Sequence, residues 1–496
     1  MTYNAHRSTE ECPLTKDTTY KYKFSNFCGD GLKFIVTCFT TLTIAITTTL
    51  VLQILYTDNA LQASGNIHGA VASDYSNCSQ IGTKMLRKGG NALDAAIATT
   101  VCMTVVAPHR TGLGGAGNIM IYNHKQQFYP IIIDFSNNIV PGISVNQVAI
   151  PAVMKGLETA HKMRGKLSWA EILKPSITLA KDGFVVSKDF VEEVSKITDY
   201  ETLYGPINAG DVLKLPELAE TLSVLAESGT DALYNGTISR KMLYTEINPS
   251  KQLETLANYT IETYEAKKID FYDHTIYYPP HATSFPFIIR ALENLNISAQ
   301  YAQSLEAQVL VAHTLINSSF LSINVIQNSE DSRYAGVMAM DWEDTYVCIL
   351  TGLRAPLGQG HFTKAGFPLD KVESNSLPFT PIIFHKKQPL CGLRGIFGTN
   401  DLFIVGQLLY NLIVRELNVS TAIEYPRYYL LPDGLAIEND KKHPVDTLLY
   451  SELSSLIATS HANANLIPKS INAILKKQDS MMSHSDSRGG GLSSRF

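Results

Sequence analysis

The sequence predicts a mixed α/β domain that follows one apolar segment long enough to cross a membrane. Residues 34–55 carry no charge, and as a helix they would span a hydrocarbon core of about 30 Å. From His68 onward, short apolar runs alternate with segments of helical period. Seven cysteines in 496 residues are too few for a disulfide scaffold, so the fold must depend on a hydrophobic core.

The apolar segment predicts a membrane anchor with a cytoplasmic N-terminus. Seven of its residues are threonines, which lower its hydropathy, and a buried core helix or a signal peptide is the alternative. A signal peptide usually has a shorter apolar run of about 7 to 15 residues. Lysine and arginine precede the segment and are then absent until Lys84, which favours a cytoplasmic tail. We therefore expect a tail over 1–33, the anchor over 34–55, a polar stalk over 56–67 and an extracellular or luminal domain over 68–496.

N-glycosylation sequons agree with this orientation. None lies in the expected tail, and all follow the anchor. The asparagines expected to carry glycans are Asn77, Asn235, Asn258, Asn296, Asn317 and Asn418.

Hydrophobic periodicity predicts the elements of the domain in chain order. The expected strands are Gly69–Ala72, Ile119–Tyr122, Pro130–Phe135, Ala335–Asp341, Tyr346–Thr351 and Pro381–Phe384. The expected helices are Cys78–Lys88, Ala92–Val106, Trp169–Lys181, Pro216–Ser228, Ser304–Leu315 and Asp401–Arg415. Pro175 should kink or interrupt the third of these helices. Residues 480–496 are rich in Ser and Gly and are expected to form a tail.

Composition and motifs exclude several classes of function. A net charge of −5 without a basic stripe argues against a nucleic-acid partner. The run Gly112–Gly117 lacks the Lys-Ser/Thr of a phosphate loop and leads into a strand, so close backbone packing is favoured. The 13 histidines show no metal-ligand spacing, and no Gly-x-Ser-x-Gly elbow occurs. We expect neither a metal nor a cofactor.

Cys78 and Cys102 flank two consecutive helical segments joined at Gly89-Gly90. An antiparallel helical hairpin could bring the two side chains together. On the residues alone, a disulfide and two buried thiols remain equally good interpretations.

Several short motifs, in order along the chain, resemble the γ-glutamyltransferase (glutathione hydrolase) family. The N-terminal ones are His68–Asp74, Ile81-Gly82, Gly89–Ile97, Pro108-His109, Gly112–Gly115 and Asp134-Phe135. The others are Trp169–Pro175, Ala180–Phe184, Pro279-Pro280, Pro426-Arg427, Leu431–Asp433 and Asp486–Gly490.

The resemblance implies an N-terminal nucleophile hydrolase fold, a four-layer αββα sandwich, on a type II anchor as in animal members. It also implies a precursor that cuts itself into a large and a small subunit and exposes a threonine. Its hydroxyl attacks the γ-glutamyl amide of glutathione, and its free α-amino group can act as the base. The resemblance further implies a Cys78–Cys102 disulfide, which vertebrate members carry at the matching positions.

The catalytic positions of the family are degenerate in this chain. Tyr334 stands where the resemblance places the nucleophile, so 68–333 and 334–496 correspond to the large and small subunits. A phenol does not readily make the N-to-O acyl shift, so we expect the chain to remain uncleaved. Ser332 could serve as the nucleophile only if the register slipped.

The positions that hold substrate in the family differ as well. Ser136 replaces an arginine that grips the substrate carboxylate. The remaining family pocket positions are Gly352 and Arg354 for a Thr and an Asn, Leu377 and Pro378 for two serines, and one glycine, Gly398 or Gly395, for the oxyanion pair. The acidic segment that binds the amino group has no clear counterpart between Gly366 and Asn375.

The sequence therefore predicts a membrane-anchored homologue that keeps the fold and has lost hydrolase and transferase chemistry, acting as a binding or scaffolding ectoprotein. The alternative is an active glutathione hydrolase with a relocated nucleophile such as Ser332. A third interpretation is a secreted form that lacks residues 1 to about 60. Glutathione or another γ-glutamyl compound would bind only if the pocket still functions, and association with related ectoproteins is a further expectation.

Overall fold

The chain folds into two compact units, Met1–Asn66 and Ile67–Phe496. The computed structural model describes residues 27–63, 69–126, 128–137, 149–197, 201–242, 249–320, 333–360, 362–370, 379–387, 392–431, 434–438, 445–456, 459–461 and 470–496.

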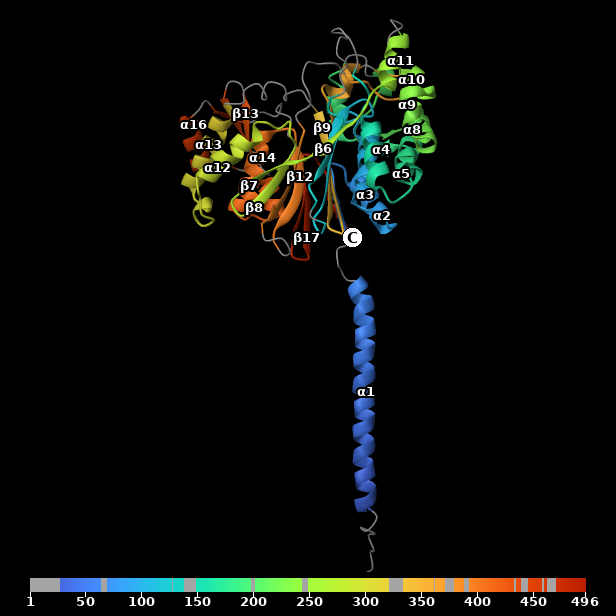
Figure 1. Ribbon diagram of the computed structural model, residues 1–496, viewed down its shortest axis with the longest axis vertical. Coiled ribbons are helices and arrows are strands. Elements are labelled where there is room, and N and C mark those ends of the chain that lie inside the picture. The colour runs from blue at the N-terminus through green and yellow to red at the C-terminus, as the bar shows by residue number, and fades with distance from the viewer. Residues whose placement is uncertain are drawn as a thin grey trace, which may run out of the picture. The chain divides into compact units, whose positions relative to one another are not determined.

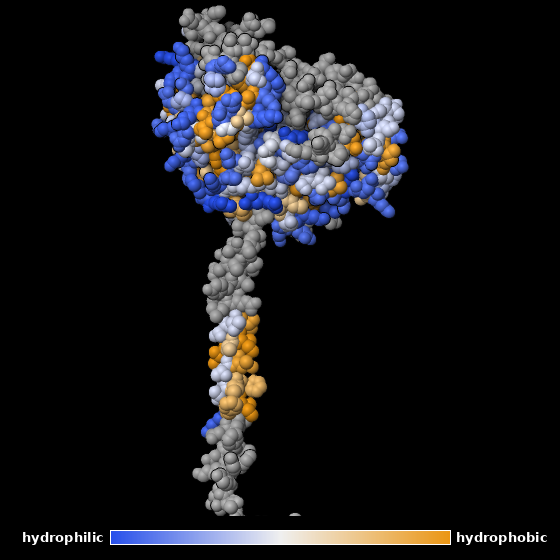
Figure 2. All heavy atoms as spheres, turned by 180° about the vertical axis from the view of Figure 1, so that it is seen from behind, coloured by the Kyte–Doolittle hydropathy of each residue, from blue (hydrophilic) through white to orange (hydrophobic). Residues whose placement is uncertain are grey.

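The first unit contains one long helix, α1 (Phe27–Ala63). Its Lys33–Val51 stretch has a mean hydropathy of 1.9, so it is long and apolar enough to cross a membrane by length and composition. The described side chains of this stretch are exposed, and apolar ones cover much of the visible face (Figure 2). Each of its seven threonines donates its hydroxyl to a carbonyl three or four residues earlier, at 2.6–2.9 Å for the shortest bond of each. The hydroxyls are thus satisfied inside the helix, and their polarity weighs less against burial in lipid. The helix continues through residues 57–63 of the expected stalk.

Two antiparallel sheets stand side by side at the centre of the second unit (Figure 1). The first sheet has the order β18-β1-β9-β10-β2-β3-β6, and the second the order β17-β16-β12-β11-β8-β7. The strands of the first are β1 (Gly69–Ala72), β2 (Ala116–Asn123), β3 (Ile131–Asp134), β6 (Glu262–Glu265), β9 (Arg333–Asp341), β10 (Thr345–Leu353) and β18 (Ser494–Arg495). Those of the second are β7 (Lys267–Phe271), β8 (His274–Tyr278), β11 (Thr380–Lys386), β12 (Arg394–Thr399), β16 (Asn472–Lys477) and β17 (Ser480–Ser485). Smaller sheets are formed by β13 (Tyr428–Leu431), β14 (Gly434–Ile437) and β15 (Thr459–His461), and by β4 (Phe184–Val185) and β5 (Val212–Leu213).

Helices cover the outer face of each sheet (Figure 1). On the first sheet lie α2 (Ser76–Arg87), α3 (Ala92–Val106), α4 (Val153–Arg164), α5 (Trp169–Asp182) and α8 (Pro216–Ser228), followed outward by α9 (Asp231–Asn235), α10 (Thr237–Met242) and α11 (Pro249–Ala257). On the second lie α12 (Phe285–Asn294), α13 (Leu305–Phe320), α14 (Leu402–Leu409), the π-helical turn η4 (Tyr410–Val414) and α16 (Thr447–Leu456). The shorter helices are α6 (Lys188–Val194), α7 (Glu201–Tyr204), α15 (Val419–Glu424), η1 (Tyr301–Gln303) and η3 (Pro356–Gly360).

Three clusters of buried apolar side chains match the three interfaces of this four-layer arrangement. One joins the first sheet to its helices, one joins the second sheet to its helices, and one lies between the sheets. The expected αββα sandwich is confirmed.

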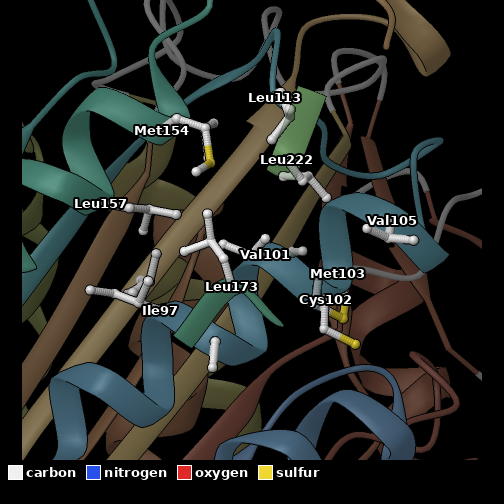
Figure 3. Close-up of a cluster of buried hydrophobic side chains, with 14 of the residues drawn as sticks. Ile97, Val101, Cys102, Met103, Val105, Leu113, Met154, Leu157, Leu173 and Leu222 are labelled. Carbon is white, nitrogen blue, oxygen red and sulfur yellow. The ribbon is translucent and has the colours of Figure 1, made fainter. Parts of the chain in front are cut away.

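Helix α3 explains why the sequence shows so strong an apolar run at 92–106. Every residue of α3 is buried, because the helix packs on the first sheet and is itself covered by α5 and α4. In Figure 3, Ile97 and Val101 of α3 lie among Met154 and Leu157 of α4 and Leu173 of α5. Asn91 and Asp94 close a reciprocal capping box at the start of the helix.

All six expected strands and all six expected helices are present, with ends shifted by up to five residues in most of them. Helix α5 runs through Pro175 instead of ending there. The helix expected over Asp401–Arg415 is divided into α14 and η4. The expected tail over 480–496 is wrong: β17 and β18 are edge strands of the two sheets. Serine and glycine there are compatible with strands because the backbone pairs with β16 and β1.

A disulfide joins Cys78 of α2 to Cys102 of α3, so the structure decides between the two interpretations of this pair. The favoured interpretation of Gly112–Gly117 also agrees with the structure. A Cβ at Gly114 would lie 2.1 Å from the carbonyl oxygen of Pro368, and one at Gly115 would lie 2.3 Å from that of Gly352. These glycines permit close contact between backbones.

Candidate functional site

Tyr334 lies near the start of β9, on the face of the first sheet that meets the second sheet. Side chains alternate along a strand, and Tyr334, Met338 and Met340 belong to the cluster between the sheets. The intervening Ala335 and Val337 belong instead to the cluster under the helices. The pleat therefore aims the Tyr334 ring into the middle of the sandwich.

The Tyr334 phenol is fully engaged with its surroundings. The side chain is buried, and its hydroxyl donates to the backbone carbonyl of Ser470 and is hydrogen-bonded to Oγ1 of Thr399 at 3.1 Å. Burial raises the pKa of Tyr334 far above its usual value. The phenol is therefore neutral and held in place, without a deprotonated oxygen to attack a substrate.

The backbone around Tyr334 belongs to an unbroken strand. Tyr334 pairs with Gly352 of β10, and Arg333 before it pairs with Leu353. The backbone of Tyr334 is therefore part of the ladder between β9 and β10. Gly352 contributes no side chain, and its other neighbour in the sheet is Ala116.

The structure brings Ser136 and Arg354 together at one side of this site. Nη2 of Arg354 donates to the backbone carbonyl of Ser136 at 3.4 Å, and Nη1 donates to Asp370 at 3.0 Å. The backbone N–H of Arg354 also donates to the Asp370 carboxylate. All three residues are buried. A guanidinium thus lies beside Ser136, supplied by the residue that follows β10, with the Asp370 carboxylate as its counter-ion.

The glycine candidates in β12 differ in position. Gly398 precedes Thr399, the hydrogen-bonding partner of Tyr334, and pairs with Pro381. Gly395 pairs with Phe384, farther along the strand. The structure brings Gly398, and not Gly395, to the Tyr334 end of the sheets. Leu377, Pro378 and Ser332 lie outside the described residues.

Sequence reasoning missed the polar residues that surround Tyr334. Nδ2 of Asn472 donates to Asp74 at 2.8 Å and to the carbonyl of Gly336 at 3.0 Å, and Arg110 pairs with Asp74 at 3.2 Å. Burial raises the pKa of Asp74, although Arg110 and Asn472 oppose the shift. Asp74 is the last residue of His68–Asp74, one of the motifs that resemble the family. No motif or pattern in the sequence indicated Asn472.

Asp370 was also missed, although it lies between Gly366 and Asn375, where no acidic counterpart of the family's segment was recognised. Its signal was an acidic residue that directly follows the apolar run Phe367-Pro-Leu369. Across the described ranges, no cluster of three His, Cys, Asp or Glu is arranged to hold a metal ion.

A family model described as gamma-glutamyltranspeptidase matches residues 78–341, just over half of the chain. Mouse glutathione hydrolase 7 is 26% identical over 499 residues, covering 81% of this chain and 74% of that protein. Human glutathione hydrolase 7 is 26% identical and covers 76% of this chain, but the match spans only 58% of its own length. Human glutathione hydrolase 5 proenzyme is 28% identical over 283 residues, which cover 51% of this chain and 49% of that protein.

Two solved structures show the same fold at low identity. Cephalosporin acylase from Bacillus halodurans superposes with a TM-score of 0.66 at 16% identity, covering 86% of this chain and 96% of that one. The structure of LmbA2991HD superposes with a TM-score of 0.68 at 14% identity, covering 86% and 98%. The fold is of the N-terminal nucleophile hydrolase type, and the chain belongs to the gamma-glutamyltranspeptidase family.

Proposed function

We propose that this protein is a membrane-anchored family member without hydrolase or transferase activity, which acts as an uncleaved binding or scaffolding ectoprotein. The observation that carries the proposal is Tyr334, a buried and hydrogen-bonded phenol at the position that the family resemblance gives to the nucleophile.

The chemistry of Tyr334 supports this proposal. A hydroxyl nucleophile needs a base, and an N-terminal residue supplies its own α-amino group. In the uncleaved chain that we propose, the nitrogen of Tyr334 is a peptide amide and cannot take up a proton in this role. The phenol is held by Thr399 and by the carbonyl of Ser470, so it would have to break both contacts before it could reach a neighbouring carbonyl carbon.

The surroundings of Ser136 support loss of glutathione binding. An α-amino acid needs a cation for its carboxylate and an anion for its amino group. Arg354 and Asp370 offer these two charges, but they are bound to each other at 3.0 Å in a buried position. A ligand would have to separate them and pair with each charge in turn, because a buried charge left without a partner is costly.

The proposed location is a membrane, in type II orientation. Helix α1 supplies an apolar stretch of sufficient length, and lysines and arginines precede it in the sequence. All six sequon asparagines are exposed, as glycan attachment on the extracellular or luminal side requires. In this arrangement 68–333 and 334–496 form one uncleaved ectodomain. The partners it would scaffold are related ectoproteins.

A denaturing gel of the purified full-length protein tests the proposal. After removal of glycans, we expect one band near the 54.6 kDa of the whole chain. A γ-glutamyl anilide assay on the same sample should show no turnover above buffer, while an active relative assayed beside it is cleaved and active. Two fragments, together with turnover that a glutamine-analogue inhibitor abolishes, would overturn the proposal.

A Ser332→Ala variant separates the proposal from its alternative. If Ser332 were a relocated nucleophile, the unmodified protein would run as two fragments and the variant as one. Under our proposal both run as single bands. A secreted form would instead be recovered from the medium without residues 1 to about 60, which mass spectrometry of the N-terminus detects.

A further inference from the structure

A small cavity lies in the helical layer that covers the second sheet, away from Tyr334. It has a volume of about 20 Å³, enough for one or two water-sized groups. None of the degenerate family positions lines it. The lining residues are Gln308 and Val311 of α13, Gln407 of α14, Tyr410 and Asn411 of η4, and Arg415, Tyr425, Pro426 and Tyr428.

Arg415 is a buried cation in the wall of this cavity, with 8% of its surface exposed. Its Nη1 donates to Oδ1 of Asn411 at 3.0 Å, and its guanidinium lies 4.3 Å from the centre of the Tyr425 ring. Its Nη2 donates to Oε1 of Gln303 at 3.5 Å. Among the described residues, no ion pair joins Arg415 to a carboxylate, and its Nε is buried without a hydrogen-bond partner. A buried charge that lacks a counter-ion is costly. The buried arginines Arg354, Arg394 and Arg427 each pair with a carboxylate, and Arg415 has no such partner among the described residues.

Two further unused donors line the same cavity. Both residues are buried as a whole, and among the described residues no hydrogen bond joins the hydroxyl of Tyr428 or Nδ2 of Asn411 to the protein, whereas Nε of Arg415 is the cavity atom that is itself buried without a partner. Burial raises the pKa of Tyr428, which keeps its hydroxyl protonated and able to donate. The amides of Gln308 and Gln407, by contrast, are engaged within the protein. The hydrogen-bonding groups of the cavity that make no bond within the protein are therefore donors.

The π-helical turn η4 creates this arrangement. The N–H of Arg415 bonds to the carbonyl of Tyr410, five residues earlier, and places Asn411 and Arg415 on adjacent turns of one wall. Such insertions weaken a helix and occur often at functional sites.

We propose that this cavity is a binding site for a compact monovalent anion, a halide or the carboxylate group of a small molecule. One positive charge with unpaired N–H and O–H donors recognises an anion. The volume excludes a nucleotide or a sugar and admits a single ion or a carboxylate head. The three tyrosine rings and Val311 give the cavity an apolar wall, which strengthens the attraction by excluding water.

Two experiments on the full-length protein test this site. In the first, crystals are soaked in bromide or in acetate, and an anomalous peak beside Arg415 reports bromide directly. In the second, thermal unfolding is followed while sodium bromide or acetate replaces sodium isethionate at constant ionic strength. A ligand of the folded state raises the melting temperature saturably. A response to bromide alone identifies a halide site, and a response to both identifies a site that also accepts carboxylates.

Variants link the response to the cavity. Tyr428→Phe removes one donor without changing the shape, and we expect about fivefold weaker binding. Arg415→Gln should weaken binding at least about tenfold. Arg240→Gln on the exposed face of α10 and the exposed Tyr301→Phe are matched controls and should titrate like the unmodified chain. The proposal is overturned if neither a bromide peak nor acetate density is found beside Arg415, or if Tyr428→Phe and Tyr301→Phe bind equally well. Tyr428→Phe decides this even if Arg415→Gln fails to fold.

Discussion

The hydroxyl of Tyr334 and Oγ1 of Thr399 lie 3.1 Å apart and connect the two sheets of the sandwich. Tyr334 belongs to β9 of the first sheet and Thr399 to β12 of the second. The residue at the position that the family resemblance gives to the nucleophile therefore makes a contact between the two sheets.

Removing this hydroxyl should destabilise the protein. In Tyr334→Phe the buried carbonyl of Ser470 and the Thr399 hydroxyl each lose a partner, so we expect the free energy of unfolding to fall by about 1–3 kcal/mol. Urea unfolding followed by circular dichroism measures the change. Tyr301→Phe, at an exposed position, should shift the midpoint hardly at all. Equal midpoints for the two variants would contradict a structural role for Tyr334.

The buried pair of Arg354 and Asp370 should show strong coupling. Asp370→Asn leaves the guanidinium without its counter-ion and should cost about 3–5 kcal/mol of stability. Arg354→Met combined with Asp370→Leu should recover part of that loss, because no buried charge remains. The exposed pair of Lys188 and Glu192 is the control, and Glu192→Gln should change stability by no more than about 1 kcal/mol. Additive effects in a double-mutant cycle at Arg354 and Asp370 would refute the coupling.

The disulfide should contribute measurably to stability. Cys78 and Cys102 are separated by 24 residues, and closing such a loop in the unfolded chain corresponds to about 3 kcal/mol. Thermal unfolding with and without a reducing agent, in the unmodified chain and in a double Cys→Ala variant, measures this contribution. The reductant should lower the melting temperature of the unmodified chain only. An equal effect on both proteins would mean that the reductant acts elsewhere.

Asp344 should make stability depend on acidic pH. Burial alone would raise the pKa of its carboxyl, but hydrogen bonds and positive charge from Arg394 at 2.6 Å, with Lys476 at 3.4 Å, hold the pKa below its usual range. A depressed carboxyl pKa contributes stability that is complete above the unfolded value of about 3.9. That stability is lost as pH falls from there through the folded value.

The test compares urea midpoints of the unmodified chain and Asp344→Asn from pH 7 to pH 3. The variant should be less stable at pH 7 and should lose less stability than the unmodified chain between about pH 4 and pH 3. Parallel pH profiles would rule out Asp344 as a source of the acid dependence.

The sequons give a prediction about orientation. If the second unit lies outside the cytoplasm, treatment with a glycan-removing amidase should lower the apparent mass of the protein made in animal cells. Single Asn→Gln changes at the six exposed sites should each remove at most one step from that shift. A protein whose mobility the amidase does not change would contradict the proposed type II topology. Asn418 differs from the other five sites, because its Oδ1 also accepts the hydrogen bond that caps the start of α15.

Much of the fold followed from periodicity, and the reason is visible in α3 and β10. Both are buried along almost their full length, so each appears in the sequence as a long apolar run. The C-terminal strands could not be found in this way. β17 is a sheet edge with alternating burial that forms a hairpin with the neighbouring β16. β18 has only two residues and is defined by its pairing with β1, far away in sequence.

The candidate site was predictable only in part, because its contacts join segments that are far apart in the sequence. Tyr334, Ser136 and Arg354 were found by matching motifs, which shows what each position has lost. Matching could not show what replaced it. That Arg354 reaches the Ser136 carbonyl and takes Asp370 as its counter-ion depends on three segments meeting in space.

The neighbours of β1 set the order in which the molecule can be assembled. β1 is the first strand of the second unit, and it pairs with β9 from the middle of the chain and with β18 at its very end. β1 is made before every other strand of this unit and must therefore wait for β18, so its edge stays open while the residues between them are made. A stop in place of Ser494, which removes Ser494, Arg495 and Phe496, leaves that edge unpaired and exposes a strand on which a second nascent chain can add.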